Sequence, residues 1–228
     1  SAFIPDNRMF TLADKSQLEL RILAHRSQDQ HMLDVFAVDG DFHADTSQRM
    51  GLPRVRAKNF NFAIPYGADA AVVAKSIGTR DVRMVDEQIR LWYQVYPGAA
   101  EYFAEQERFG LENGYVVTTG GRKMRIPWEL GEKHGRNCCR NYPIQGTAAE
   151  DVFELMNWVV DETDWLEITR LQVHDELIFD GEVELPGMVL NGEESKKEGV
   201  SVYDVKGDLA WLSGYYAPIQ VKRKERWG

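Results

Sequence analysis

Cysteine is nearly absent from this sequence of 228 residues, which contains only Cys138 and Cys139, next to each other. Adjacent cysteines match neither the spacing of a disulfide framework nor that of a four-ligand zinc site. The sequence therefore predicts a reducing compartment, and we expect a cytoplasmic protein.

Long hydrophobic runs are also missing. No apolar stretch reaches the length that spans a bilayer, and the residues after Ser1 lack the pattern of a signal peptide. We therefore expect no membrane partner. A hydrophobic content of 43% and a charged content of 28% are ordinary for a soluble globular protein, and the length allows one or two domains.

Positive charge is in deficit, because 27 Lys and Arg residues face 36 Asp and Glu residues, which gives a net charge of −9. This balance excludes a global attraction to nucleic acid, so any site for a polyanion must be a local basic patch. Such patches occur at residues 54–58, 122–125 and 222–226. Taken alone, each is more typical of a solvated surface than of a binding site.

Among the residues that are present, one stretch stands out at residues 171–180, L-Q-V-H-D-E-L-I-F-D. Two apolar runs flank His174, Asp175 and Glu176, which predicts a hairpin with these polar residues at its tip. Carboxylates beside apolar strands are unfavourable unless a cation or donor compensates them, and a divalent metal would do so. The alternative is an ordinary acidic turn.

Asp14 is a second carboxylate in a similar position. Residues 9–13 form an apolar run that predicts a buried strand, and helical periodicity begins shortly after it, with Glu19 in the first turn. Asp14 is therefore expected where a strand leads into a helix. The N-terminus of a helix favours an anion or a metal-bridged phosphate.

Residues 28–114 have an almost wholly helical pattern, punctuated by glycines. This pattern predicts a helical module inserted after the segment that carries Asp14. The expected helices lie at residues 30–37, 43–50, 53–64, 69–77, 81–96 and 99–112.

The helix predicted from residue 53 carries a stripe of four side chains, Arg54, Lys58, Phe62 and Tyr66. Residues four apart stay near one helix face, so this face offers two cations and then two aromatic rings. Cations suit a triphosphate, and aromatic faces suit a base. The alternative is an amphipathic core helix with two snorkelling basic residues.

The next part of the sequence predicts a hairpin and two helices. Residues 115–119 and 124–127 flank a basic tip and predict a β-hairpin. A helix at residues 132–141 is expected to be broken by Pro143, which removes a backbone donor. A long amphipathic helix then follows at about residues 148–160.

The last part of the sequence carries weaker signals. Residues 186–200 are polar and rich in Gly, Glu and Lys, which predicts a loop or an irregular insertion. Residues 217–222 alternate between apolar and polar and predict a final strand. Pro218 favours a position for this strand at a sheet edge.

Four of these segments, in this order, resemble motifs of the family A DNA polymerases, the DNA polymerase I family. Residues 14–21, D-K-S-Q-L-E-L-R, resemble the first palm motif, D-Y-S-Q-I-E-L-R. The stripe in residues 54–67 is similar to the fingers-helix motif. Residues 141–149 are similar to the N-x-P-x-Q-G-T-A-A signature, and residues 172–177 match the second catalytic palm motif, Q-V-H-D-E-L.

The resemblance covers about residues 1–180 and implies an α+β fold. An antiparallel palm sheet would carry the catalytic carboxylates, and a helical fingers module would be inserted into it. The palm would comprise residues 1–28 and 131–228, and the fingers residues 29–130. Because Asp14 and Asp175 each lie at the end or tip of a strand, we expect adjacent strands of one sheet to bring them together.

The resemblance also implies an activity, the template-directed transfer of nucleotides from dNTPs to the 3′-hydroxyl of a primer on primer-template DNA. This chemistry uses two Mg²⁺ ions. Asp14, Asp175 and the backbone carbonyl of Lys15 would hold the metal. Glu176 would lie near the primer terminus, and Lys58 would complete the catalytic set.

Binding roles follow from the same resemblance. The expected dNTP contacts are Arg54 and Lys58 on the triphosphate, His43 on a phosphate, Phe62 on the sugar, and Tyr66, Gln17 and Glu19. Within this set, Glu19 would be the steric gate against a ribose, and Tyr66 would guard the templating position. The expected DNA contacts are Asn141, Gln145 and His174, and Gln17 would also touch primer or template. Arg122, in the basic tip of the predicted hairpin, is a further expected contact with the DNA backbone, and the alternative for it is a solvated hairpin tip.

Three departures from the family pattern bear on the site. Lys15 replaces the usual tyrosine, although only its carbonyl is needed for metal. Pro65 falls inside the fingers helix, which should therefore kink or stop near Ile64. Where a basic residue is expected four positions before Asn141, residue 137 is asparagine; the candidate substitutes are Arg136 and Arg140.

The family's thumb, the first part of its palm and its usual exonuclease domain have no counterpart in the sequence. We therefore expect a second polypeptide that carries the thumb, the remaining palm and such an exonuclease. A split gene, a processed precursor and an intein-interrupted precursor would each produce this arrangement. The short segment after residue 180, where a longer family segment is usual, favours a divergent viral member. The expected place of action is a nucleoid or a viral replication site in a host cell.

Two other functions stay open. A non-catalytic DNA-binding or assembly subunit would keep the palm fold, but it would have no need for Asp14, Asp175 and Lys58 together. A two-metal nuclease would need the paired carboxylates. It would have no use for the stripe of cations and aromatic rings.

Overall fold

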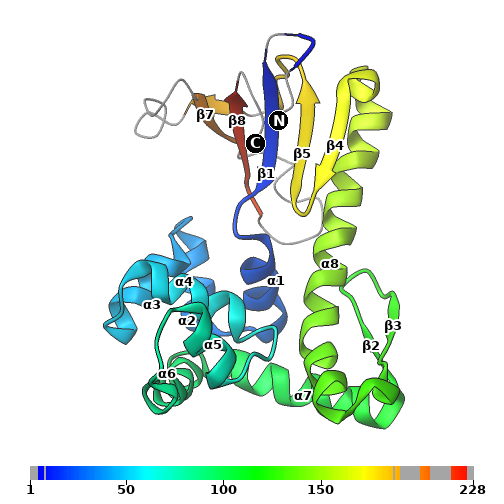
Figure 1. The fold of residues 1–228 in the computed structure, drawn as a ribbon. Coiled ribbons are helices and arrows are strands. Elements are labelled where there is room, and N and C mark those ends of the chain that lie inside the picture. Colours follow the sequence, from blue (N-terminus) through cyan, green and yellow to red (C-terminus); the bar gives the residue numbers. More distant parts are fainter. Residues whose placement is uncertain (1–4, 8, 187, 191–200, 206–216, 225–228) are drawn as a thin grey trace. The chain divides into compact units, whose positions relative to one another are not determined.

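The structure is a computed structural model that describes residues 5–7, 9–186, 188–190, 201–205 and 217–224. The chain forms two compact units. The sheet unit comprises Ser1–Leu18 and Ala148–Gly228, and the helical unit comprises Glu19–Thr147 (Figure 1). The palm and fingers boundaries expected after residues 28 and 130 both fall inside the helical unit.

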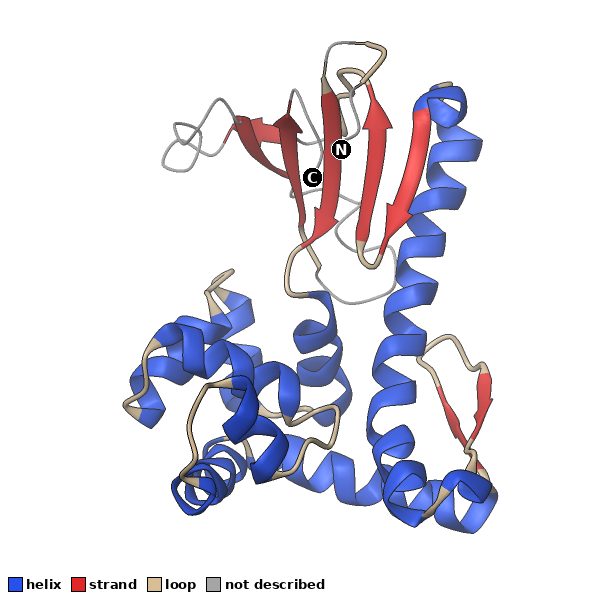
Figure 2. Cartoon of the chain, viewed as in Figure 1, coloured by secondary structure: helices blue, strands red, loops and turns tan. Residues whose placement is uncertain are grey.

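The described part of the sheet unit is built on a six-stranded sheet with the order β4-β5-β1-β8-β7-β6 (red in Figure 2). Every neighbouring pair of strands is antiparallel, which confirms the expected α+β fold with an antiparallel sheet. The strands are β1 (Phe10–Lys15), β4 (Thr169–Val173), β5 (Glu176–Asp180), β6 (Met188–Leu190), β7 (Ser201–Val205) and β8 (Ile219–Lys224). The loop predicted at residues 186–200 is wrong at Met188–Leu190, which form strand β6, and residues 187 and 191–200 lie outside the described residues.

Strand β1 lies inside this sheet and is buried on both faces. Phe10 and Leu12 form a small core cluster with Ile178 of β5 on one face. Side chains alternate between faces along a strand, so Asp14 shares this face and Lys15 points to the other one. Lys15 is fully buried there, which is unusual because lysine side chains are almost never fully buried unless they are paired.

Helix α8 (Glu132–Glu162) runs without interruption through Pro143, so the predicted break is wrong. A proline inside a helix removes one donor and crowds the preceding turn, which costs roughly 3 kcal/mol. Apolar burial on both sides of the proline offsets that cost. Cys139 packs in a buried cluster with Val116, and Leu155 is buried further along the helix.

Strand β8 was expected at a sheet edge, but it lies between β1 and β7. The expectation is wrong because Pro218 precedes the strand, so the ladder loses no donor. The carbonyl of Pro218 instead accepts a hydrogen bond from the backbone N–H of Ser16, at 2.9 Å.

The helical unit confirms the six helices predicted between residues 30 and 112, each within two residues of its expected bounds. The hairpin of β2 and β3 is confirmed as well. Within the described residues, no helix is long and apolar enough to cross a membrane. The elements are α1 (Leu18–Ser27), α2 (Gln30–Ala37), α3 (Phe42–Met50), α4 (Arg54–Ala63), α5 (Ala70–Ser76), α6 (Val82–Val95), α7 (Pro97–Asn113), β2 (Tyr115–Val117) and β3 (Lys123–Arg125).

Aspartate side chains begin four of these helices. Each accepts a hydrogen bond from a backbone N–H in the first turn, where the helix itself supplies no acceptor. These caps fix where the helices start. They are Asp29 on α2, Asp41 on α3, Asp69 on α5 and Asp81 on α6.

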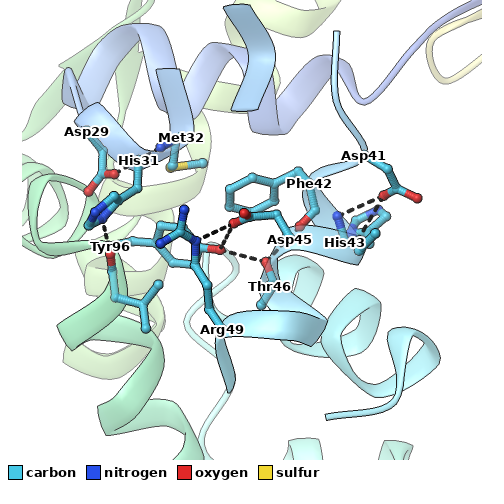
Figure 3. Close-up of polar contacts among 12 residues, drawn as sticks. Asp29, His31, Met32, Asp41, Phe42, His43, Asp45, Thr46, Arg49 and Tyr96 are labelled. Atoms are coloured by element: carbon cyan, nitrogen blue, oxygen red, sulfur yellow. Dashed lines mark hydrogen bonds and ion pairs between the residues drawn. The ribbon is translucent and has the colours of Figure 1, made fainter. Parts of the chain in front are cut away.

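Buried aromatic rings form the core of the helical unit. Phe42, Trp92 and Tyr96 are fully buried and in ring contact, which joins α3 to α6. The hydroxyl of Tyr96 lies 2.8 Å from that of Thr46 (Figure 3). The indole N–H of Trp92 donates to Asn61 of α4 at 2.8 Å, so buried polar groups have partners here.

Candidate active site

The predicted carboxylates meet at one end of the sheet. Asp14 of β1 lies directly opposite Glu176 of β5 in the antiparallel ladder. The backbone N–H of Lys15 donates to the carbonyl of Asp175 at 3.1 Å, which holds the β4–β5 turn against the end of β1. The expectation that adjacent strands bring Asp14 and Asp175 together is confirmed.

The turn that carries Asp175 has a tight geometry. Strands β4 and β5 pair from Val173 to Glu176, so His174 and Asp175 alone form the turn. His174 has a left-handed φ of 55°, a conformation that most side chains avoid. The side chain of Gln172 donates to the carbonyl of His174, which supports this conformation.

Negative charge is crowded at this end of the sheet. Burial, and then the neighbouring charge of Asp175, raise the pKa of Asp14 to about 6. The ammonium of Lys222, on β8, lies 3.8 Å from Asp14 and opposes the rise. Lys222 faces the carboxylates because it lies diagonally from Asp14 on the same sheet face.

Two carboxylates and one backbone carbonyl are expected to bind a divalent metal at this end of the sheet. No group of three or more His, Cys, Asp or Glu side chains that could hold a metal occurs among the described residues. The expected ligands are two carboxylates and the backbone carbonyl of Lys15, so the predicted site has fewer than three such side chains. A desolvated carboxylate beside another carboxylate is stabilised by a cation, so the raised pKa of Asp14 is consistent with a metal site.

A second group of predicted residues meets within the helical unit. The hydroxyl of Tyr66 donates to the carboxylate of Glu19, with oxygen distances of 2.8 and 2.9 Å. The side-chain amide of Gln145 donates to the same hydroxyl at 2.8 Å. Helix α4 ends at Ala63, which confirms the stop predicted from Pro65, and Tyr66 lies just beyond that end.

The stripe on α4 lies on its exposed face. Arg54, Lys58 and Phe62 are exposed, whereas Ala57 and Phe60 on the opposite face are buried. The stripe therefore does not face the core, although α4 is an amphipathic helix, as the alternative expected. The ammonium of Lys58 lies 5.8 Å from the ring centre of Phe62, within reach of a cation–π contact.

Asp41 neutralises Arg54 in this structure. Its carboxylate accepts a hydrogen bond from Nε of Arg54 at 2.7 Å and forms an ion pair with Nη2 at 2.6 Å while it caps α3. Partial burial alone would raise the pKa of Asp41, but the hydrogen bonds from Arg54 and from the α3 backbone lower it. Asp41 was not among the predicted site residues; its position just before a helix marks it only as a cap.

His43 is buried beside this group. Its ring lies 5.4 Å from that of Phe62, and Nδ1 lies 3.1 Å from the side-chain nitrogen of Asn61. Burial lowers the pKa of His43 to about 4, with Arg54 and Lys58 adding to the decrease and Asp41 opposing it. His43 is therefore neutral at physiological pH.

The remaining predicted DNA contacts are spread over other elements. Arg122, in the β2–β3 hairpin, is exposed and donates to the carbonyl of Gly146 at 3.1 Å. Gln17 precedes α1 with a left-handed φ of 52°. Asn141 is half-buried on α8, and within the described residues no hydrogen bond or ion pair links it to another predicted site residue.

The two candidate substitutes for the missing basic residue are engaged elsewhere. Arg136 forms an ion pair with Glu107 at 3.0 Å. Arg140 pairs with the same carboxylate and also donates to the hydroxyl of Tyr93 at 3.1 Å. Both arginines therefore connect α8 to the neighbouring helices of the helical unit.

The sequence profile of DNA polymerase family A matches residues 1–186 of this chain. DNA polymerase I of Pseudomonas aeruginosa is 33% identical over 226 residues, which cover 90% of this chain and 24% of that protein. DNA polymerase I A, chloroplastic/mitochondrial, of Arabidopsis thaliana is 28% identical over 225 residues, which cover 79% of this chain and 21% of that protein. The chain thus spans less than a quarter of the length of these relatives.

A solved structure has a similar fold. It is the POL domain of Pol1 from M. smegmatis in complex with DNA primer-template and dNTP. The TM-score is 0.73 at 22% sequence identity, over 97% of this chain and 40% of that chain.

Proposed function

Because this chain belongs to DNA polymerase family A, we propose that it is the catalytic portion of a DNA-directed DNA polymerase. The observation that supports this most is the meeting of Asp14, Asp175 and Glu176 at one end of the sheet. In this proposal, residues 1–28 and 131–228 act as the palm, and residues 29–130 as the fingers.

The carboxylates of Asp14 and Asp175, with the carbonyl of Lys15, would hold two Mg²⁺ ions. Bound there, the ions would activate the primer hydroxyl and neutralise the pyrophosphate that leaves. Glu176 lies opposite Asp14 and would face the primer terminus. The raised pKa of Asp14 supports this assignment, because the crowded charge favours cation binding.

The exposed face of α4 would bind the dNTP. Arg54 and Lys58 would hold the triphosphate, and Arg54 would exchange Asp41 for phosphate oxygens. His43 would act as a neutral hydrogen-bonding partner of a phosphate. Phe62, which is exposed beside Lys58, would pack on the sugar.

Glu19, Tyr66 and Gln145 would form the part of the site that reads sugar and template. The hydroxyl of Tyr66 fixes the carboxylate of Glu19, which would then exclude a ribose 2′-hydroxyl. Gln17, Asn141, His174 and Arg122 would contact primer or template. These local contacts would bind DNA despite the net charge of −9.

This chain aligns with only part of the length of its relatives. The matched region is 24% of the Pseudomonas aeruginosa protein and 40% of the solved POL domain chain. We propose that a polypeptide carrying the thumb and the remaining palm complements it, with an exonuclease as a further part.

Primer extension with dNTPs and Mg²⁺ tests the proposal. The assay compares wild type with Asp175→Ala, each with and without a thumb-bearing polypeptide. Extension by the complemented wild type and its loss in Asp175→Ala are expected. DNA degradation without extension would favour a nuclease, and DNA binding without either reaction would favour a non-catalytic subunit.

A further inference from the structure

Lys15 and Asp151 form a buried ion pair within the sheet unit. The ammonium of Lys15, on β1, lies 3.1 Å from the carboxylate of Asp151, on α8. The two side chains are 0% and 1% exposed. The pair therefore joins the strand that carries Asp14 to helix α8.

Stability alone does not account for such a pair. Removing two charges from water is unfavourable, and a well-packed apolar pair of similar volume is often as stable or more stable. The surroundings would suit an apolar pair, because Ala13 on β1 and Val152 on α8 are also buried. A charged pair at this position therefore needs another role, such as holding the backbone of β1 in one orientation.

Backbone hydrogen bonds around Lys15 identify the part of the chain that the ion pair would hold in place. The N–H of Lys15 bonds the carbonyl of Asp175, and the N–H of Ser16 bonds the carbonyl of Pro218 before β8. The side chain of Lys15 adds a third link, to α8. Lys15, which follows Asp14 directly, thereby connects the end of β1 to the Asp175 turn and to α8.

We propose that the Lys15–Asp151 pair is a positioning device that fixes the end of β1 and thereby the geometry of Asp14 toward Asp175. The proposal rests on the proposed function, in which these two carboxylates hold the metal. Lys15 would act there in two ways, with its carbonyl as a metal ligand and with its side chain as the anchor of that carbonyl.

The test replaces the ion pair by an apolar pair, Lys15→Met with Asp151→Leu, in the complemented protein. Single replacements are avoided because they leave one buried charge without its partner. Binding of Mn²⁺ without nucleotide is measured by calorimetry, thermal unfolding by circular dichroism, and kcat and KM for dNTP by primer extension. We expect an unfolding midpoint no lower than wild type, with Mn²⁺ binding about tenfold weaker, kcat about tenfold lower and KM within about twofold.

Two further variants make the result specific. The swapped pair, Lys15→Asp with Asp151→Lys, should recover Mn²⁺ binding to within about threefold of wild type. The control is Arg170→Gln with Asp180→Asn, an ion pair of the same sheet at the opposite end of β5. It should alter the unfolding midpoint and leave Mn²⁺ binding unchanged.

The proposal is overturned if the apolar pair binds Mn²⁺ and turns over like wild type, or if the control pair weakens Mn²⁺ binding equally. If the apolar pair does not fold, the swapped pair decides, and Mn²⁺ binding as weak as that of Asp14→Asn would overturn the proposal. If wild type never extends a primer, the proposed polymerase function fails, while the Mn²⁺ measurements still test the positioning role.

Discussion

The carboxylate end of the sheet unit and the α4 face of the helical unit hold their predicted residues in different ways. In the sheet unit, ladder register and backbone hydrogen bonds set the positions of Asp14 and Asp175. On α4, exposed side chains such as Arg54 and Lys58 are held mainly by contacts with other side chains. The first region is therefore fixed by the backbone, and the second can change partners without a change of fold.

This contrast predicts that Asp14→Asn will have the largest effect on activity and will not impair folding. If Asp14 binds metal as proposed, the loss of its carboxylate should lower kcat by roughly a thousandfold. Because burial and Asp175 raise the pKa of Asp14, its charge is unfavourable above pH 6. Urea unfolding without divalent ions should therefore show a gain of about 1–2 kcal/mol in the free energy of unfolding, after allowance for partial exposure. A loss of stability would contradict the crowded-charge description.

Lys58→Ala should affect ligand binding and leave stability nearly unchanged. If Lys58 contacts the triphosphate as proposed, its loss should lower kcat/KM for dNTP by roughly a hundredfold, while the free energy of unfolding stays within about 0.5 kcal/mol. The matched control is Lys75→Ala, an exposed lysine of α5. Equal losses in the two variants would show that the α4 face is not special.

Acid should destabilise the helical unit through His43. The unfolded-state pKa is about 6.5 and the native value about 4, so the unfolded state takes up the proton first as pH falls. The free energy of unfolding should therefore decrease between about pH 6.5 and pH 4, by up to about 1.4 kcal/mol for each pH unit. His43→Gln should flatten this decrease. An unchanged slope in His43→Gln would contradict the depressed pKa.

Tyr66→Phe should have the smallest of these effects. Glu19 loses a hydrogen bond from the hydroxyl, so its carboxylate is held less firmly against a ribose. The ratio of kcat/KM for dNTP over rNTP should fall by about three- to tenfold. Tyr93→Phe, which removes a hydroxyl bonded to Arg140, provides the control. A ratio that does not change would separate Tyr66 from the proposed steric gate.

Local patterns predicted the elements well. Helices with aspartate caps and apolar periodicity were found within two residues, because capping and periodicity are encoded in neighbouring residues. The meeting of Asp14 and Asp175 was predictable too, since each ends a short strand. The residue roles assigned at both regions stay predictions until the variants are measured.

The errors came from features that depend on distant parts of the chain. Pro143 was expected to break α8, but burial on both sides of it outweighs one lost donor. The edge position of β8 was wrong because its neighbours come from far away in the sequence. The Lys15–Asp151 pair left no local signal, since a lysine after a strand carboxylate and an aspartate in a helix are each unremarkable alone.

The ion pair between Arg54 and Asp41 should affect how strongly dNTP binding depends on ionic strength. Asp41 acts as a counterion that belongs to the protein, so an arriving triphosphate would displace a carboxylate as well as solution ions. Binding affinity depends less on salt concentration when the ligand displaces an internal counterion than when it releases ions into solution. The binding of dNTP should therefore respond less to added salt than the number of cations near it suggests, and Asp41→Asn, which keeps the helix cap, should steepen that response.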